Sequence, residues 1–169
     1  MRLIAFASVA MLVLVRPEVA FAQACRPVSH QQLEALLPLL PKEFSRGTPN
    51  GETDTQEAVS RTTVDYENRA TAAVISVELM DTCRNSDMLS QLREFLKTGP
   101  PATPGTAFRS VPVQGFPAYE EWTAQSRHTE IHVLVADRFM VKVTGGLVDL
   151  VQVQNAAQAI ELKKLAVLR

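Results

Sequence analysis

Two alternating apolar runs, joined by a three-residue turn, constrain the fold of this chain more than any other feature. Their apolar side chains recur at every second position, in two sets: Ile131, Val133 and Val135, then Phe139, Val141 and Val143. Each set lies on one face of a strand, because side chains alternate between the faces. A shift of the strand pairing by one residue would expose a whole apolar set to water, so the two sets are expected to face each other. This register places His132 opposite Lys142 and Glu130 opposite Thr144.

The other strands are predicted from the same kind of alternation. Six ranges are expected to be strands: 58–67, 73–79, 109–113, 118–125, 129–135 and 139–144. Short polar turns separate most of them, which is typical of antiparallel hairpins. The polar stretch 45–57 carries Pro49, Asn50 and Gly51 together and is expected to be an exposed loop.

Three helices are predicted from capping residues followed by apolar residues at helical spacing. The caps are, in chain order, Ser29, either Asn85 or Ser86, and Asp149. Pro38 keeps the first helix short, and the second ends by Gly99 because two prolines follow it. The predicted order is α-β-β-α-β-β-β-β-α. It indicates an α+β domain in which helices pack on an antiparallel sheet of about six strands.

The first 24 residues have the pattern of a cleavable secretory signal. Arg2 precedes an uninterrupted apolar run over residues 3–15. At about 1.5 Å per residue, this run is too short to span a hydrocarbon core of about 30 Å. Small residues allow cleavage after Ala22 or after Ala24. We therefore expect residues 25–169 to form a single exported domain, periplasmic or secreted, with no transmembrane segment.

Cys25 and Cys83 are the only cysteines in the chain. In an oxidising compartment an even pair predicts a disulfide, here worth about 4 kcal/mol by the loop-entropy relation. The alternative is a lipidated Cys25 at the mature N-terminus. Lipoprotein signals favour an aliphatic residue, usually leucine, three positions before the cysteine, where this chain has Ala22. The sequence therefore favours the disulfide over the lipid anchor.

Charge and composition exclude one class of partner. Hydrophobic residues make up 46% of the chain and charged residues 21%, as in ordinary globular proteins. Without Arg2, Arg16 and Glu18 of the leader, 15 basic and 17 acidic residues remain. A near-neutral domain lacks the basic surface that binds a phosphate backbone, so we expect no nucleic-acid partner.

One cluster has residue types that bind metals. His128, Glu130 and His132 alternate, so they project from one face of a strand. Imidazole and carboxylate groups are zinc ligands, and zinc is the cofactor such a cluster would hold. Against this, Lys142 lies opposite His132, and a cation disfavours a bound metal. Glu121 is expected on the other side of His132, which would make an ordinary charge ladder.

Tyr119 and Trp122 lie three positions apart on one predicted strand, so they point to opposite faces. We expect Trp122 to pack in the core against Ile131. Tyr119 would then point outward, where it is a candidate for a binding surface, although packing in the core or at the sheet edge is favoured.

No catalytic motif stands out in the sequence. None of the serines lies in a G-x-S-x-G motif, and Gly145-Gly146 is too short to cradle a phosphate. We therefore expect a non-catalytic binding or accessory domain, whose partner is an envelope protein or a small ligand. The alternatives are a small metal-dependent enzyme that uses His128, Glu130 and His132, and an envelope component anchored through Cys25.

Several short segments resemble a pattern in uncharacterised exported bacterial proteins. They are LEALLP near the start, VQGFPAY over 113–119, LVADRF over 134–139 and AIELKKL over 159–165. The element order is also similar to that of the Mog1/PsbP-like fold. The resemblance implies a fold and an accessory role, and it implies no site residues.

Overall fold

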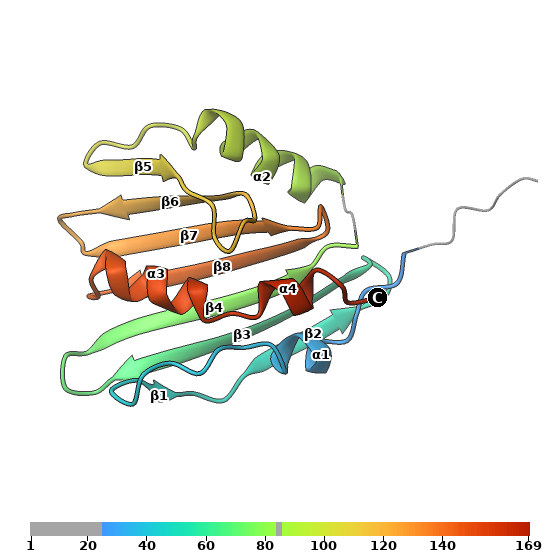
Figure 1. Cartoon of the computed structure of the whole chain (residues 1–169), viewed down its shortest axis with the longest axis horizontal. Helices are drawn as coiled ribbons and strands as arrows, with labels where there is room; N and C mark the ends of the chain where they lie inside the picture. The colour runs from blue at the N-terminus through green and yellow to red at the C-terminus, as the bar shows by residue number, and fades with distance from the viewer. Residues whose placement is uncertain (1–24, 84–85) are drawn as a thin grey trace, which may run out of the picture.

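Eight antiparallel strands form one sheet in the computed structural model, which describes residues 25–83 and 86–169 (Figure 1). The strands are β1 (Ser45–Arg46), β2 (Asn50–Asp54), β3 (Val59–Asn68), β4 (Ala73–Asp81), β5 (Thr106–Ser110), β6 (Ala118–Thr123), β7 (His128–Val135) and β8 (Phe139–Gly146). Their spatial order is β1-β3-β4-β8-β7-β6-β5, and β2 also pairs with β3. The helices are α1 (His30–Glu34), α2 (Ser86–Thr98), α3 (Leu150–Gln158) and α4 (Leu162–Leu165). The α+β class with an antiparallel sheet is thus confirmed.

The central register agrees with the alternation of the sequence. Ile131 lies opposite Val143, Val133 opposite Val141 and Val135 opposite Phe139, and all six side chains are buried. His132 lies opposite Lys142 and Glu130 opposite Thr144, as predicted. The hairpin of β3 and β4 is also confirmed, with Val64 opposite Val77.

The predicted count of about six strands is wrong, because the expected loop 45–57 contains β1 and β2. Both strands pair with β3 at the margin of the sheet and are largely solvated. A strand with no buried face needs no apolar alternation, so its sequence resembles a loop. The predicted strand 109–113 begins three residues earlier, at Thr106, and ends at Ser110, while Val113 forms an isolated bridge with Phe116. A fourth helix, α4, buries Leu162 and Leu165.

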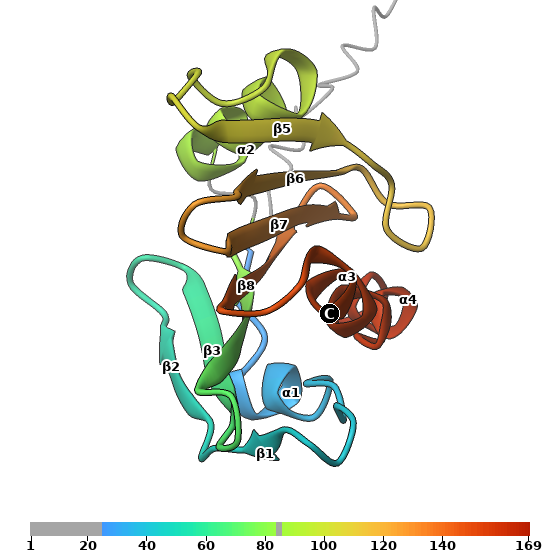
Figure 2. The same cartoon turned by 90° about the vertical axis from the view of Figure 1, so that its left-hand side faces the viewer.

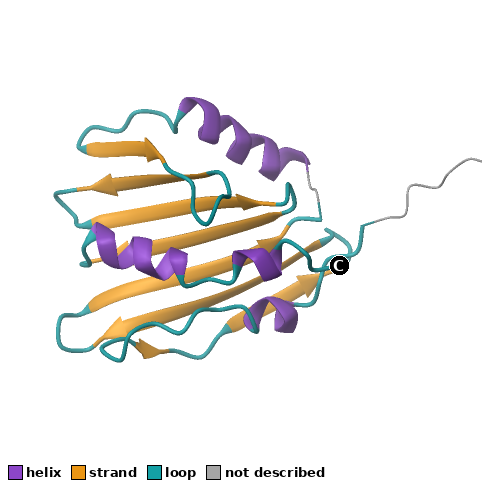
Figure 3. Cartoon of the chain, in the orientation of Figure 1, coloured by secondary structure: helices purple, strands orange, loops and turns teal. Residues whose placement is uncertain are grey.

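The two faces of the sheet are covered by different helices. Seen close to edge-on, the twisted sheet has α1, α3 and α4 on one side (Figure 2). In the view onto the face of the sheet, these helices lie in front of the strands (Figure 3). These helices cover the main core, which includes Ile75, Val141 and Leu162. Helix α2 instead packs with Tyr119 and Leu134 in a separate cluster on the opposite face. The remainder of that face is polar and partly exposed, as is common for one face of an antiparallel sheet.

The segment before α1 is attached to the end of β4 by two features. A disulfide joins Cys25 to Cys83 across a separation of 58 residues, which confirms the predicted bond. Next to it, the fully buried carboxylate of Asp81 accepts hydrogen bonds from the backbone N–H groups of Val28 and Cys83. The guanidinium of Arg138 bonds to both carboxylate oxygens. Cys25 is therefore not a free thiol.

Two predictions fall on residues outside the described ranges: the secretory signal over 1–24 and the cap of the second helix at Asn85. Helix α2 itself runs over Ser86–Thr98 and ends before Gly99, as expected. Within 25–83 and 86–169, none of the helices has the length and apolarity needed to cross a bilayer.

Candidate functional site

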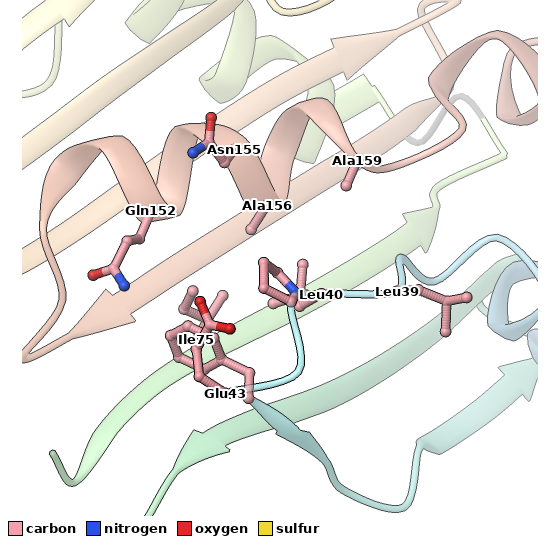
Figure 4. A pocket seen from close by; sticks show the side chains of 10 residues that line it. Leu39, Leu40, Glu43, Ile75, Gln152, Asn155, Ala156 and Ala159 are labelled. Carbon is pink, nitrogen blue, oxygen red and sulfur yellow. The ribbon is translucent and has the colours of Figure 1, made fainter. Parts of the chain in front are cut away.

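A groove lies between helix α3 and the segment Leu39–Phe44, above strand β4 (Figure 4). We call it the α3 groove. Its volume is about 540 Å³, within the range of small-molecule sites. The residues that line it are Leu39, Leu40, Pro41, Glu43, Phe44, Ile75, Gln152, Asn155, Ala156 and Ala159.

The first wall is α3, and its position depends on Gly145 in β8. A Cβ atom at this residue would overlap the side chains of Val153 and Val148, so glycine lets the helix approach the sheet closely. A capping box between Asp149 and Gln152 fixes the start of the helix. Its other end is held by Gln114, whose amide donates to the carbonyl oxygens of two residues there: Gln158 and Ile160. The small side chains of Ala156 and Ala159 leave space between this helix and the facing segment.

The second wall is the segment Leu39–Phe44, which two buried contacts hold in place. The hydroxyl of Tyr66 donates to the carbonyl oxygen of Pro38 at 2.5 Å. Phe44 is buried, and its N–H donates to the carbonyl oxygen of Pro41 in a tight turn. Between these anchors Leu39 remains 83% exposed. An exposed leucine beside a groove is an apolar surface available to a ligand.

The groove is apolar along its length, with polar groups at its upper and outer margins. Figure 4 shows Gln152, Ala156 and Ala159 directed from α3 toward the facing segment, while Asn155 stands on top of the helix. The carboxylate of Glu43 rises from the opposite wall. Glu43 is the charged residue that lines the groove, while the neighbouring Lys42 belongs to the same segment but not to the lining. The arrangement can accommodate an apolar ligand body and a neutral or cationic head group.

The structure brings His128, Glu130 and His132 together, as predicted, in a hydrogen-bonded ladder that Lys142 joins through an ion pair with Glu130. One carboxylate oxygen of Glu130 lies 3.1 Å from Nε2 of His128, and the other lies 2.9 Å from Nε2 of His132 and from Nζ of Lys142. Across 25–83 and 86–169, no set of three or more His, Cys, Asp or Glu side chains is arranged to hold a metal ion. Glu121 lies opposite Glu130 rather than beside His132, where Tyr119 is found instead.

The ladder strongly favours the charged form of Glu130. The hydrogen bond with His132 holds the pKa of the Glu130 carboxyl well below its usual range, and Lys142 and His128 lower it further against the opposing effect of burial. The carboxylate is thus neutralised by its neighbours on the same sheet face.

Tyr119 takes the packed position that the sequence favoured over an outward one, whereas Trp122 is not buried in the core as expected. Tyr119 is buried against α2 and stacks on His132 with the ring centroids 4.7 Å apart. Burial, and then the charges of Glu121 and Glu130, raise the pKa of Tyr119 to about 12. Trp122 is partly exposed, opposite Thr129, under the guanidinium of Arg109. Tyr119 therefore forms no outward binding surface, because α2 covers the face to which it points.

None of the residues that line the α3 groove was singled out as a site residue from the sequence. Leu39 had a usable signal, because it lies between Pro38 and Pro41, where the helix has already ended and a leucine has no helical face to bury. Ala156 and Ala159 had no such signal, because alanine is an ordinary residue in a helix. The groove lies between two segments that are more than a hundred residues apart in the chain, so no local pattern predicts it.

Comparisons with known proteins identify no relative of this chain. No protein-family model matches it, and neither a curated protein nor a solved structure does. The class defined by the fold is therefore an α+β domain with an open apolar groove, and the function rests on the geometry described above.

Proposed function

We propose that this protein is an exported, non-catalytic binding domain whose ligand lies in the α3 groove. The observation that carries the proposal is the combination of a volume of about 540 Å³ with the 83% exposed Leu39 at its margin. Ligand pockets are concave, mainly apolar and furnished with a few polar groups, and this groove has each property.

The lining restricts the chemistry of the ligand. Leu40, Ile75 and Ala156 offer an apolar surface for an acyl or aromatic body. Glu43 attracts a cation and repels an anion, so the head group is cationic or neutral. At an exposed site this electrostatic preference is worth about 1 kcal/mol, which corresponds to a severalfold difference in affinity.

Two probes with the same ten-carbon tail test this proposal by calorimetric titration below their micelle concentrations. Decylammonium is expected to bind about fivefold more tightly than decanoate, because only the former complements Glu43. Ala159→Phe places a ring in the groove from an exposed position at the end of α3, so the core remains intact. This variant is expected to bind decylammonium at least about tenfold more weakly.

Ala70→Phe is the matched control, since Ala70 is also exposed but lies in the turn between β3 and β4. Its affinity for decylammonium should equal that of the parent protein. Equal affinities in the Ala159→Phe variant and the parent would show that the tail binds elsewhere, and the groove would no longer explain the function.

We further propose that the protein is exported by its first 24 residues and that the lipid anchor is not used. The apolar leader and the small residues before Cys25 support export. The disulfide between Cys25 and Cys83 supports it as well, because such bonds persist in oxidising compartments. The same bond argues against an acylated Cys25, whose sulfur would have to be free. The similarity to the Mog1/PsbP-like element order is compatible with an accessory role.

Mass spectrometry of the protein isolated from its own envelope tests this part. We expect a mature chain that begins at Gln23 or Cys25, two protons lighter than the reduced form. An added diacylglycerol on Cys25, or an uncleaved leader, would contradict the proposal.

A further inference from the structure

A second hollow lies on the opposite flank of α3, toward strands β6 and β7. We call it the Glu120 pocket. Its volume is about 300 Å³, and its floor includes Ile131 of β7. The α3 groove reaches Ile75 of β4, on the other side of β8 in the sheet. Asn155 on top of the helix borders both. The two hollows are thus separate sites that share one helix as a wall.

The pocket contains a buried carboxylate whose bonding capacity is not exhausted. Glu120 is 2% exposed. Its Oε1 accepts from Nε and Nη2 of Arg109, and its Oε2 accepts from the amide of Gln154 at 2.8 Å. A carboxylate offers about four acceptor positions, two on each oxygen. One acceptor position on Oε2 therefore remains for a ligand.

Three side-chain amides line the pocket together with this carboxylate: Gln154, which contacts it, and Asn155 and Gln158. The amides of Asn155 and Gln158 make no hydrogen bond to other side chains or to the backbone within 25–83 and 86–169, and the amide oxygen of Gln154 also makes none. Each amide can both donate and accept. Opposite them lie the aliphatic side chains of Val111 and Val113.

The charges in the pocket cancel. Arg109 neutralises Glu120, so neither an anion nor a cation gains from entering. A metal ion would have to compete with the guanidinium for Oε1. The pocket therefore presents a neutral set of hydrogen-bonding groups beside an aliphatic surface.

We propose that the Glu120 pocket binds a neutral, polyhydroxylated ligand of the sugar class. Vicinal hydroxyl groups would donate to Oε2 of Glu120 and exchange hydrogen bonds with the amides of Gln154, Asn155 and Gln158. The C–H face of the ring would lie against Val113 and Ile131. The proposal is independent of the α3 groove and its apolar ligand.

Titration with glucose and with N-acetylglucosamine, followed by ¹⁵N–¹H correlation spectra, tests the proposal. At least one of the two sugars is expected to shift the side-chain NH₂ signals of the three amides in a saturable way. A dissociation constant of about 1 mM is expected, since a single sugar ring makes few contacts. Glucuronate, which carries a charge that the pocket does not complement, should bind more weakly than glucose.

Two variants separate ligand binding from a purely structural role of Glu120. Glu120→Gln weakens the acceptor and should reduce sugar affinity about tenfold. Since this change also alters a buried ion pair, Gln158→Ala is the second test. The Gln158 side chain is exposed and bonds to nothing in the described chain. Its removal should therefore leave stability unchanged and still weaken binding severalfold.

Glu121→Gln is the matched control, because Glu121 is the next residue on β6 and points to the other face. It should leave sugar affinity unchanged. The proposal is overturned if neither sugar shifts the three amides up to about 50 mM, well above the expected dissociation constant. It is also overturned if the shifts persist undiminished in Gln158→Ala. Ala159→Phe blocks only the α3 groove, so it should not affect sugar binding. The proposals for the α3 groove and the Glu120 pocket can therefore be refuted independently.

Discussion

Replacing Asp81 by alanine is expected to lower the free energy of unfolding by about 3–5 kcal/mol, as for other broken buried ion pairs. The side chain is 0% exposed, and its two oxygens accept four hydrogen bonds. Two of these come from Arg138, whose pKa is raised by the bond to Asp81. The variant leaves that guanidinium, 14% exposed, without its counter-ion. It also leaves the backbone N–H groups of Val28 and Cys83 unsatisfied.

Urea unfolding followed by circular dichroism measures the effect. Glu52→Ala is the matched control, because Glu52 also pairs with an arginine, Arg61, but is 65% exposed and lies in an ordinary strand. Exposed ion pairs contribute about 0–1 kcal/mol, so this variant should unfold close to the parent. Equal losses in the two variants would contradict the importance assigned to the buried pair.

Replacing Cys25 and Cys83 together by serine is expected to lower the free energy of unfolding by about 2–5 kcal/mol. The bond closes a loop with a sequence separation of 58 and so restricts the unfolded chain. It also holds the segment before α1 on the end of β4. Amide hydrogen exchange should therefore show lost protection around Val28 and Leu33 before α3 is affected.

Reduction of the parent protein provides the control, because the chain has no other cysteines. The reduced parent and the double serine variant should unfold at the same urea concentration. The disulfide and Asp81 hold the same segment, so their effects should not be additive. A double serine variant as stable as the oxidised parent would show that Asp81 and Arg138 secure this end alone.

Strong side-chain alternation predicted the centre of the sheet correctly. Both faces of β7 and β8 carry distinct residue types, and a shifted register would expose six buried side chains. The capping boxes at Ser29 and Asp149 were equally readable, because capping depends on residues three apart. Patterns among residues close together in the chain therefore predicted these strands and helices.

The margins of the sheet and the candidate sites could not be predicted in this way. The solvated strands β1 and β2 carry no alternation, so only their pairing with β3 makes them strands. The burial of Tyr119 depended on which face α2 would cover. The buried position of Glu120 depended on Arg109 from β5 and Gln154 from α3 arriving at the same place.

The sequence by itself determined the fold class, the register of the β7–β8 hairpin and the pairing of the only two cysteines. The fold class and the register follow from the spacing of apolar residues along the chain. The disulfide follows because the chain has only two cysteines. Only the tertiary structure decided where the two hollows beside α3 lie and which groups line them. Their walls come from segments far apart in the chain, and the position of the helix depends on a glycine in β8 that lets it approach the sheet. Such distances are set by packing, which no local pattern encodes.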